Sequence, residues 1–126
     1  MVTMRRRGFT LIEMLVVMAI MATLLAIAAP RYFASMERAK DATLHADLRV
    51  MREAIDKYHA DTGAWPKQLE DLVTARYLRS IPVDPITGLA TTWLAQPDPD
   101  GRTPGIYDIR SGAPGSGQDA TAYASW

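Results

Sequence analysis

Few side chains of this sequence are spaced for catalysis or for metal binding. His45 and His59 lie 14 residues apart, too far to share a metal ion on one helical turn, and we expect both on a helix surface. Asp98 and Asp100, in the stretch PDPDG, are typical of a solvated turn. The chain has no cysteine, which excludes disulfides and thiolate metal sites. Because no nucleophile–base pair or glycine-rich phosphate loop is present either, we predict that the protein is not an enzyme.

Glu13 is the ionisable residue in the most unusual setting. It lies within a run of 21 mostly apolar residues, Phe9 to Ala29, which is long enough to span a bilayer. A charge in the bilayer core costs ~2.5–3.5 kcal/mol on insertion scales, and a partner of opposite sign lowers that cost. A secretory signal peptide, with an apolar core of ~7–15 residues, or a plain membrane anchor leaves the acid unexplained. The residues alone therefore assign Glu13 no role.

The charge balance indicates an orientation and argues against nucleic acid. Arginines at positions 5, 6 and 7 precede the apolar run, so the positive-inside rule predicts a cytoplasmic amino terminus. Basic and acidic residues each number 14, and without the first eight residues 11 basic residues face 14 acidic ones. A mildly acidic remainder does not favour a nucleic-acid partner. At 126 residues the chain forms one small unit, too short for a large enzyme beside the apolar run.

A long helix must position Glu13. Neither Gly nor Pro occurs between residues 31 and 61, so we expect the helix to continue from the apolar run to about residue 61. Its second half carries an apolar stripe at helical spacing, formed by Leu44, Leu48, Met51, Ile55 and Tyr58. A short helix is expected from residue 67 to about 75, and two strands over 91–95 and 105–110. The predicted fold class is α+β, a long amino-terminal helix packed on a small antiparallel sheet.

The stretch GFTLIE, after a short basic leader, resembles the prepilin peptidase recognition segment of type IV pilins and type II secretion pseudopilins. The resemblance implies cleavage between Gly8 and Phe9, methylation of the new Phe9 amine, and retention of the apolar helix. In a filament, the amine of one subunit would lie near Glu13 of another and pair with it. Pro30 matches the proline that commonly kinks or locally melts the pilin helix at the end of its apolar part.

The rest of the chain resembles the major pseudopilin of the type II secretion system, through TGAWP, LEDLV, IPVDPITG and GIYDIRSGA. The resemblance implies a leader over 1–8, a transmembrane and filament-core helix over 9–29, and a periplasmic pilin-like head over 30–126. It implies a single-pass protein of the bacterial inner membrane that polymerises into a helical homo-oligomer, the pseudopilus, to drive protein export. The implied partners are minor pseudopilins, the prepilin peptidase and an inner-membrane assembly platform. The alternative is a type IV pilin or minor pilin-like subunit acting in adhesion or DNA uptake; the absence of cysteine favours the pseudopilin.

The resemblance also raises the question of calcium. Major pseudopilins typically bind calcium in the loop after the YD strand, through backbone carbonyls and two aspartates. Asp119 is the counterpart of the later aspartate, but the earlier one is replaced around Pro114. Calcium takes 6–8 oxygen ligands, so Asp119 with Ser111 and carbonyls would form a weak site. The sequence leaves two alternatives open: calcium at Asp119, or a loop held by glycine turns and by packing of Trp126.

Overall fold

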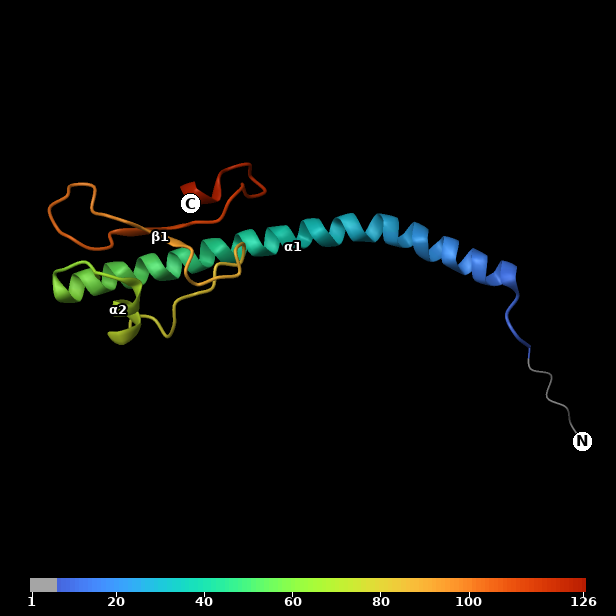
Figure 1. The fold of residues 1–126 in the computed structure, drawn as a ribbon, viewed down its shortest axis with the longest axis horizontal. Helices are drawn as coiled ribbons and strands as arrows, with labels where there is room; N and C mark the ends of the chain where they lie inside the picture. Colours follow the sequence, from blue (N-terminus) through green and yellow to red (C-terminus); the bar gives the residue numbers. More distant parts are fainter. Residues whose placement is uncertain (1–6) are drawn as a thin grey trace, which may run out of the picture. The chain divides into compact units, whose positions relative to one another are not determined.

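The computed structural model describes residues 7–126, which divide into two units, one ending at Met36 and the other spanning Glu37–Trp126. Helix α1, Leu11–Thr62, contributes to both units (Figure 1). Its amino-terminal part is long and apolar enough, by length and composition, to cross a membrane. The expected long helix is therefore confirmed.

Pro30 lies inside α1, and the helix is not melted there. A proline in a helix interior removes one backbone hydrogen bond and crowds the preceding turn. The neighbouring residues have high helix propensity, with Ala28 and Ala29 before the proline and no glycine nearby, so helical backbone continues on both sides. The local melting implied by the resemblance is absent from this structure.

Helix α1 ends where a glycine allows it. Gly63 adopts a φ of 73°, and its N–H donates to the His59 carbonyl at 2.8 Å. A residue with positive φ after the last helical turn is the usual way to satisfy the final carbonyls, and glycine adopts it without steric cost. Gly63 therefore ends the helix close to the expected position, about residue 61.

Helix α2 spans Leu69–Thr74, two residues later than the expected start. Gln68 is extended and caps the helix, and Asp71 accepts hydrogen bonds from the backbone N–H groups of Lys67 and Gln68 at 2.9 and 3.2 Å. The first polar residues therefore form the cap and not the first turn. The helix ends at Thr74, and Arg76, which follows the C-cap residue Ala75, has a φ of 66° although glycine is usual at such a position.

Two short strands, β1 (Trp93–Gln96) and β2 (Asp108–Ser111), pair antiparallel with Trp93 opposite Ser111. The predicted hairpin is confirmed, but each strand starts later than expected. Gly105 is held against Trp65 and Pro66 instead, and the N–H of Ile106 donates to the Pro66 carbonyl at 2.7 Å. A side chain at Gly105 would collide with Trp65 and Pro66. The segment before β2 therefore packs against the connection between α1 and α2 and does not pair with β1.

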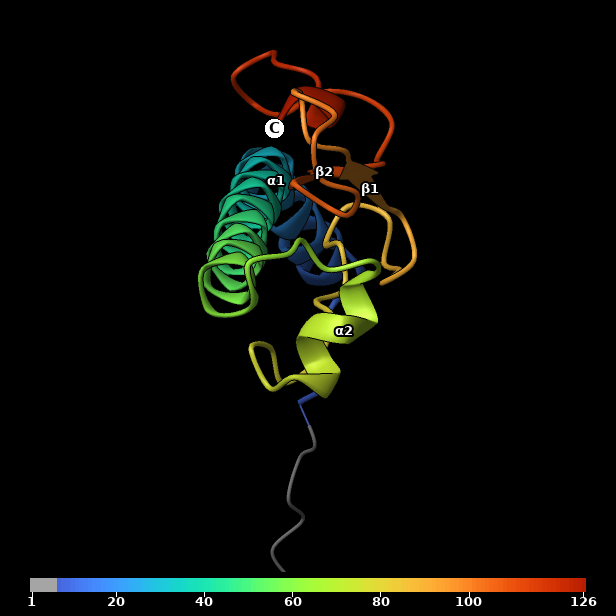
Figure 2. The ribbon, with the colours of Figure 1, turned by 90° about the vertical axis from the view of Figure 1, so that its left-hand side faces the viewer.

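The core of the second unit lies where α1, α2 and the sheet meet. Figures 1 and 2 show the two strands between α2 and the carboxy-terminal segment, alongside the later half of α1. A two-stranded sheet is not stable alone and needs such a helix to cover it. The expected stripe of α1 is buried, apart from the half-buried Tyr58. The buried apolar residues are Leu44, Leu48, Met51, Ala54, Ile55, Leu72, Leu78, Trp93, Ile106, Ile109, Ala113 and Tyr123.

Arg52 fastens β2 to α1. Its Nε donates to Asp108 Oδ1 at 2.7 Å, and its Nη2 donates to the Ile109 carbonyl at 2.9 Å. Two bonds from one planar guanidinium fix the direction of the strand as well as its distance from the helix. Side chains of both Arg52 and Asp108 are about one-third exposed, so the pair orients the sheet more than it stabilises it.

Asp84 joins the segment Pro82–Pro85 to β2. Its side chain is fully buried, with Oδ2 accepting from the Ser111 hydroxyl at 2.6 Å and Oδ1 accepting from the Ile86 N–H at 2.8 Å. The Ser111 oxygen in turn accepts from the Ala113 N–H at 3.1 Å. A buried carboxylate is tolerated only when donors surround it in this way. Nothing in the sequence indicated that this acid is buried.

Candidate processing and assembly site

The expected cleavage point lies outside the helix. Gly8 and Phe9 have no regular secondary structure, both are exposed, and Phe9 is 77% exposed. Nothing lies within 4 Å of the position that a Gly8 Cβ would occupy. Proteolytic cleavage occurs preferentially in exposed, irregular backbone, and the Gly8–Phe9 bond has both properties.

Thr10 and Glu13 form a reciprocal cap at the start of α1. The Glu13 N–H donates to Thr10 Oγ1 at 3.2 Å, and the Thr10 N–H donates to Glu13 Oε2 at 3.4 Å. The N–H of Met14 donates to the Thr10 carbonyl at 3.2 Å and opens the helical ladder. This is the capping-box arrangement, and it aims the Glu13 carboxylate back toward Phe9.

Glu13 was expected to be functional, but Thr10 was not expected to be its partner. The signal was present, because a threonine followed three residues later by glutamate and an apolar run is the sequence signature of a capping box. The structure thus brings together Phe9, Thr10 and Glu13. Pro30 lies 17 positions further along α1 and is not part of this group.

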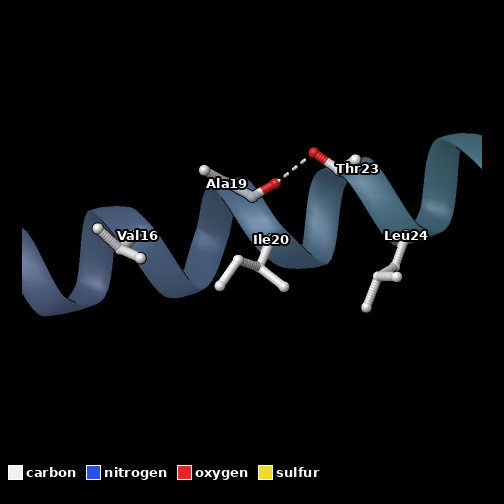
Figure 3. Close-up of a pocket in the computed structure, with 5 residues that line it drawn as sticks. All are labelled: Val16, Ala19, Ile20, Thr23 and Leu24. Carbon is white, nitrogen blue, oxygen red and sulfur yellow. Dashed lines mark hydrogen bonds between the residues drawn. The ribbon is translucent and has the colours of Figure 1, made fainter.

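The apolar part of α1 carries an open groove beyond the cap. Val16, Ala19, Ile20, Thr23 and Leu24 line it, and the Thr23 hydroxyl donates to the Ala19 carbonyl at 2.8 Å (Figure 3). The hydroxyl is thus satisfied within the helix, which removes most of its cost in hydrocarbon. Small side chains at such positions let another helix approach closely. The surface of this segment is therefore compatible with both lipid and a neighbouring helix.

The loop for which the sequence leaves calcium as one alternative holds its single acidic side chain in a local turn. Asp119 Oδ1 accepts from both the N–H and the hydroxyl of Thr121, at 3.0 and 2.6 Å. These bonds lower the pKa of Asp119 from its ordinary value. The Ser111 hydroxyl is buried and donates to Asp84 instead. Among residues 7–126, no group of three acidic or histidine side chains is arranged to hold a metal ion.

The two histidines lie on α1 as expected, but each stacks on a tryptophan. His45 lies against Trp126 with ring centroids 3.9 Å apart, and His59 lies against Trp65 at 3.6 Å. His59 Nδ1 is buried without a hydrogen-bond partner among the described residues. The stacking could not be seen in the sequence, because each pair joins a helix to a separate segment.

A basic leader, a capped apolar helix and a small antiparallel head together define the class of pilin-like proteins. Comparison with known proteins agrees. Residues 3–29 match the family model described as the prokaryotic N-terminal methylation motif. The chain is 34% identical over 101 residues to the type II secretion system core protein G of Pseudomonas aeruginosa, covering 65% of this chain and 71% of that protein.

The protein of the same name from Klebsiella michiganensis is 30% identical over 130 aligned positions, covering 90% of each chain. The type IV major pilin protein of Neisseria gonorrhoeae is 36% identical over 64 residues, covering 49% of this chain and 37% of the pilin. No solved structure matches significantly. The chain belongs to the family of type II secretion system core protein G, the major pseudopilins.

Membership establishes the function at the level of the family. The chain is a structural subunit of the pseudopilin type, membrane-associated and polymerising in the manner of a pilus. The pilin match is confined to about half of the chain, so it is the weaker alternative. The relatives are structural subunits, in keeping with the expectation of a non-enzymatic role.

Proposed function

We propose that a prepilin peptidase cleaves the chain between Gly8 and Phe9 and methylates the new Phe9 amine. Residues 1–8 then form the leader, 9–29 the transmembrane and filament-core helix, and 30–126 the head. The exposed, irregular backbone at Gly8 supports cleavage there. The match of residues 3–29 to the methylation motif supports the second step.

Glu13 then drives polymerisation by pairing with the Phe9 amine of a neighbouring subunit. The observation that carries this step is the capping box, which holds the carboxylate at the first turn of α1, beside the new terminus. The Thr10 N–H donates one hydrogen bond but carries no net charge, so this bond alone does not neutralise the carboxylate in the bilayer. A neighbour that brings a cation removes that cost, and only one axial stagger allows the pair to form.

The remaining partners and the location follow from the family and the charge pattern. The head lies in the periplasm, because the arginines at positions 5–7 hold the amino terminus in the cytoplasm. Minor pseudopilins join the filament, and an inner-membrane assembly platform adds subunits to it. The polymer exports proteins by growing, which requires no active site in this chain.

Mass measurement of the mature protein tests processing. The expected mass is that of residues 9–126 with one added methyl group. A full-length mass, or one starting after Ala26, Ala28 or Ala29 as signal peptidase would produce, overturns the cleavage proposal.

Glu13→Leu and Glu13→Gln test assembly. Both variants should be inserted and cleaved, but sheared filament should fall by roughly 100-fold, because ~2.5–3.5 kcal/mol of driving force is removed. Thr23→Val is the matched control: it removes a polar group from the same helix, one whose hydroxyl already bonds to Ala19, and should assemble normally. Normal filament yield from Glu13→Gln would show that the charge is not needed.

A further inference from the structure

The carboxy-terminal loop, residues 112–126, is bound to α1 by one buried carboxylate. Asp41 is 8% exposed; its Oδ2 accepts from the Gln118 N–H at 2.8 Å and its Oδ1 accepts from the Tyr123 hydroxyl at 2.9 Å. The two donors lie 77 and 82 residues away in sequence. Hydrogen bonds to an ionised carboxylate are about twice as strong as neutral ones, and burial protects both from water.

An aromatic contact one helical turn later holds the same loop. The ring of Trp126 stacks on His45, with centroids 3.9 Å apart and planes 14° apart, and Tyr123 meets Trp126 edge-on at 5.0 Å. Gly117 makes the approach possible, since a Cβ there would overlap the Trp126 ring and lie 3.1 Å from Asp41 Oδ2. The loop thus contacts two residues of α1 that lie one helical turn apart: Asp41, through hydrogen bonds, and His45, through stacking.

The loop offers calcium a poor set of ligands. Asp119 is the sole acidic side chain of residues 112–126, and its Oδ1 accepts two hydrogen bonds from Thr121. The carbonyls of Gly117 and Thr121 accept from the Ala120 and Gly117 N–H groups at 3.0 and 2.9 Å. Calcium takes 6–8 oxygen ligands, usually with several carboxylates among them, and one acidic side chain held in a local turn does not meet that need.

We infer that Asp41, together with the His45–Trp126 stack, fastens the carboxy-terminal loop to α1 in the role that calcium has in related pseudopilins, so that the head folds without the ion. Two carboxylate hydrogen bonds fix the loop at Gln118 and Tyr123, on either side of the Asp119–Thr121 turn. The carboxylate of Asp41 lies on the helix, and the groups that donate to it lie in the loop. A calcium ion in the loop would instead need oxygen ligands from the loop itself.

Thermal unfolding of the full chain in detergent tests the inference. All three tryptophans lie in the second unit, so their fluorescence reports on the head and not on the apolar helix. Wild-type protein should melt at the same temperature in a chelator and in calcium at about 10 mM, which exceeds the dissociation constants of weak extracellular sites. Asp41→Asn should lower that temperature by about 5–15 °C in both solutions. Glu53→Gln, at an exposed acid of the same helix, is the control and should change it little.

Chymotrypsin cleavage after Tyr123, followed by mass measurement well below the melting temperature, separates local release from global unfolding. Tyr123 is buried in the wild type, and Asp41→Asn should speed its cleavage by about tenfold or more. A chelator should leave the wild-type rate unchanged. The inference is overturned if calcium raises the wild-type melting temperature or slows this cleavage and Asp119→Ala abolishes the effect. It is equally overturned if Asp41→Asn behaves as Glu53→Gln does.

Discussion

Replacement of Asp84 by alanine should destabilise the head severely. The carboxylate is fully buried and accepts the Ser111 hydroxyl at 2.6 Å and the Ile86 N–H at 2.8 Å. Alanine leaves both donors without an acceptor, away from water, and each such loss costs about 1–3 kcal/mol. A weaker bond from the Thr87 N–H, at 3.3 Å, is also lost. The sum is about 3–5 kcal/mol, a large share of the 5–15 kcal/mol typical of a whole domain.

Tryptophan fluorescence of the full chain in detergent measures this loss during heating or in urea. For a unit of this size, about 3–5 kcal/mol corresponds to a fall in Tm of about 15–30 °C. Asp98→Ala is the matched control, because Asp98 accepts a similar turn hydrogen bond, from the Asp100 N–H at 3.0 Å, but is only half-buried and its bond is exposed to water. That control should cost less than about 1 kcal/mol.

A graded variant keeps the prediction testable if Asp84→Ala does not fold. Ser111→Ala removes one of the donors to the carboxylate and should cost about 1–2 kcal/mol. The reasoning is refuted if Asp84→Ala lowers Tm no more than Asp98→Ala does. It also fails if the costs of Asp84→Ala and Ser111→Ala add without coupling in a double-mutant cycle, because the two side chains are in direct contact.

Three further predictions concern the head. Arg76→Gly should stabilise it by about 1 kcal/mol, since a φ of 66° strains any residue but glycine, and an unchanged Tm would contradict this. Burial, and then the charge of Asp84, raises the pKa of Asp47, so the ionised form of Asp47 destabilises the head. Asp47→Asn should therefore raise the Tm at pH 7 but not in acid, where Asp47 is protonated. Equal changes in Tm at both pH values would refute this. Burial, and then the bond to Asp41, raises the pKa of Tyr123 to about 12, so its folded form holds the proton more tightly than the unfolded form. The contribution of Tyr123 to the free energy of unfolding should be fully present below pH ~10 and should decrease as the pH rises toward 12. In thermal melts at alkaline pH, Tyr123→Phe should show a smaller decrease in Tm with pH than the wild type.

Local pattern was enough to predict the elements whose cause lies within a few residues. The apolar run predicted the membrane segment by its length, and the spacing of Leu44, Leu48, Met51 and Ile55 predicted the buried face of α1. The absence of Gly and Pro between residues 31 and 61 predicted where α1 ends, and two short strand-like runs predicted the antiparallel sheet. Strand limits were less accurate, because Gly105 is held by Trp65 and Pro66, about 40 residues earlier in the chain.

The contacts of the carboxy-terminal loop depended on tertiary structure. Nothing in the sequence around Asp41 distinguishes it from the exposed acids of the same helix. It is buried only because Gln118 and Tyr123, about 80 residues away, fold over it. The fit of calcium to Asp119 likewise depends on whether Thr121 already occupies that carboxylate.

Hydrophobic length and helical spacing act over short range, so the residues alone predicted the membrane segment and the buried face of α1, and the resemblance of GFTLIE to a known segment predicted the class of protein. Which acids are buried, and what holds the loop, depended on the folded head. Burial of a charge is settled by the donors that surround it, and in this head those donors come from distant parts of the chain.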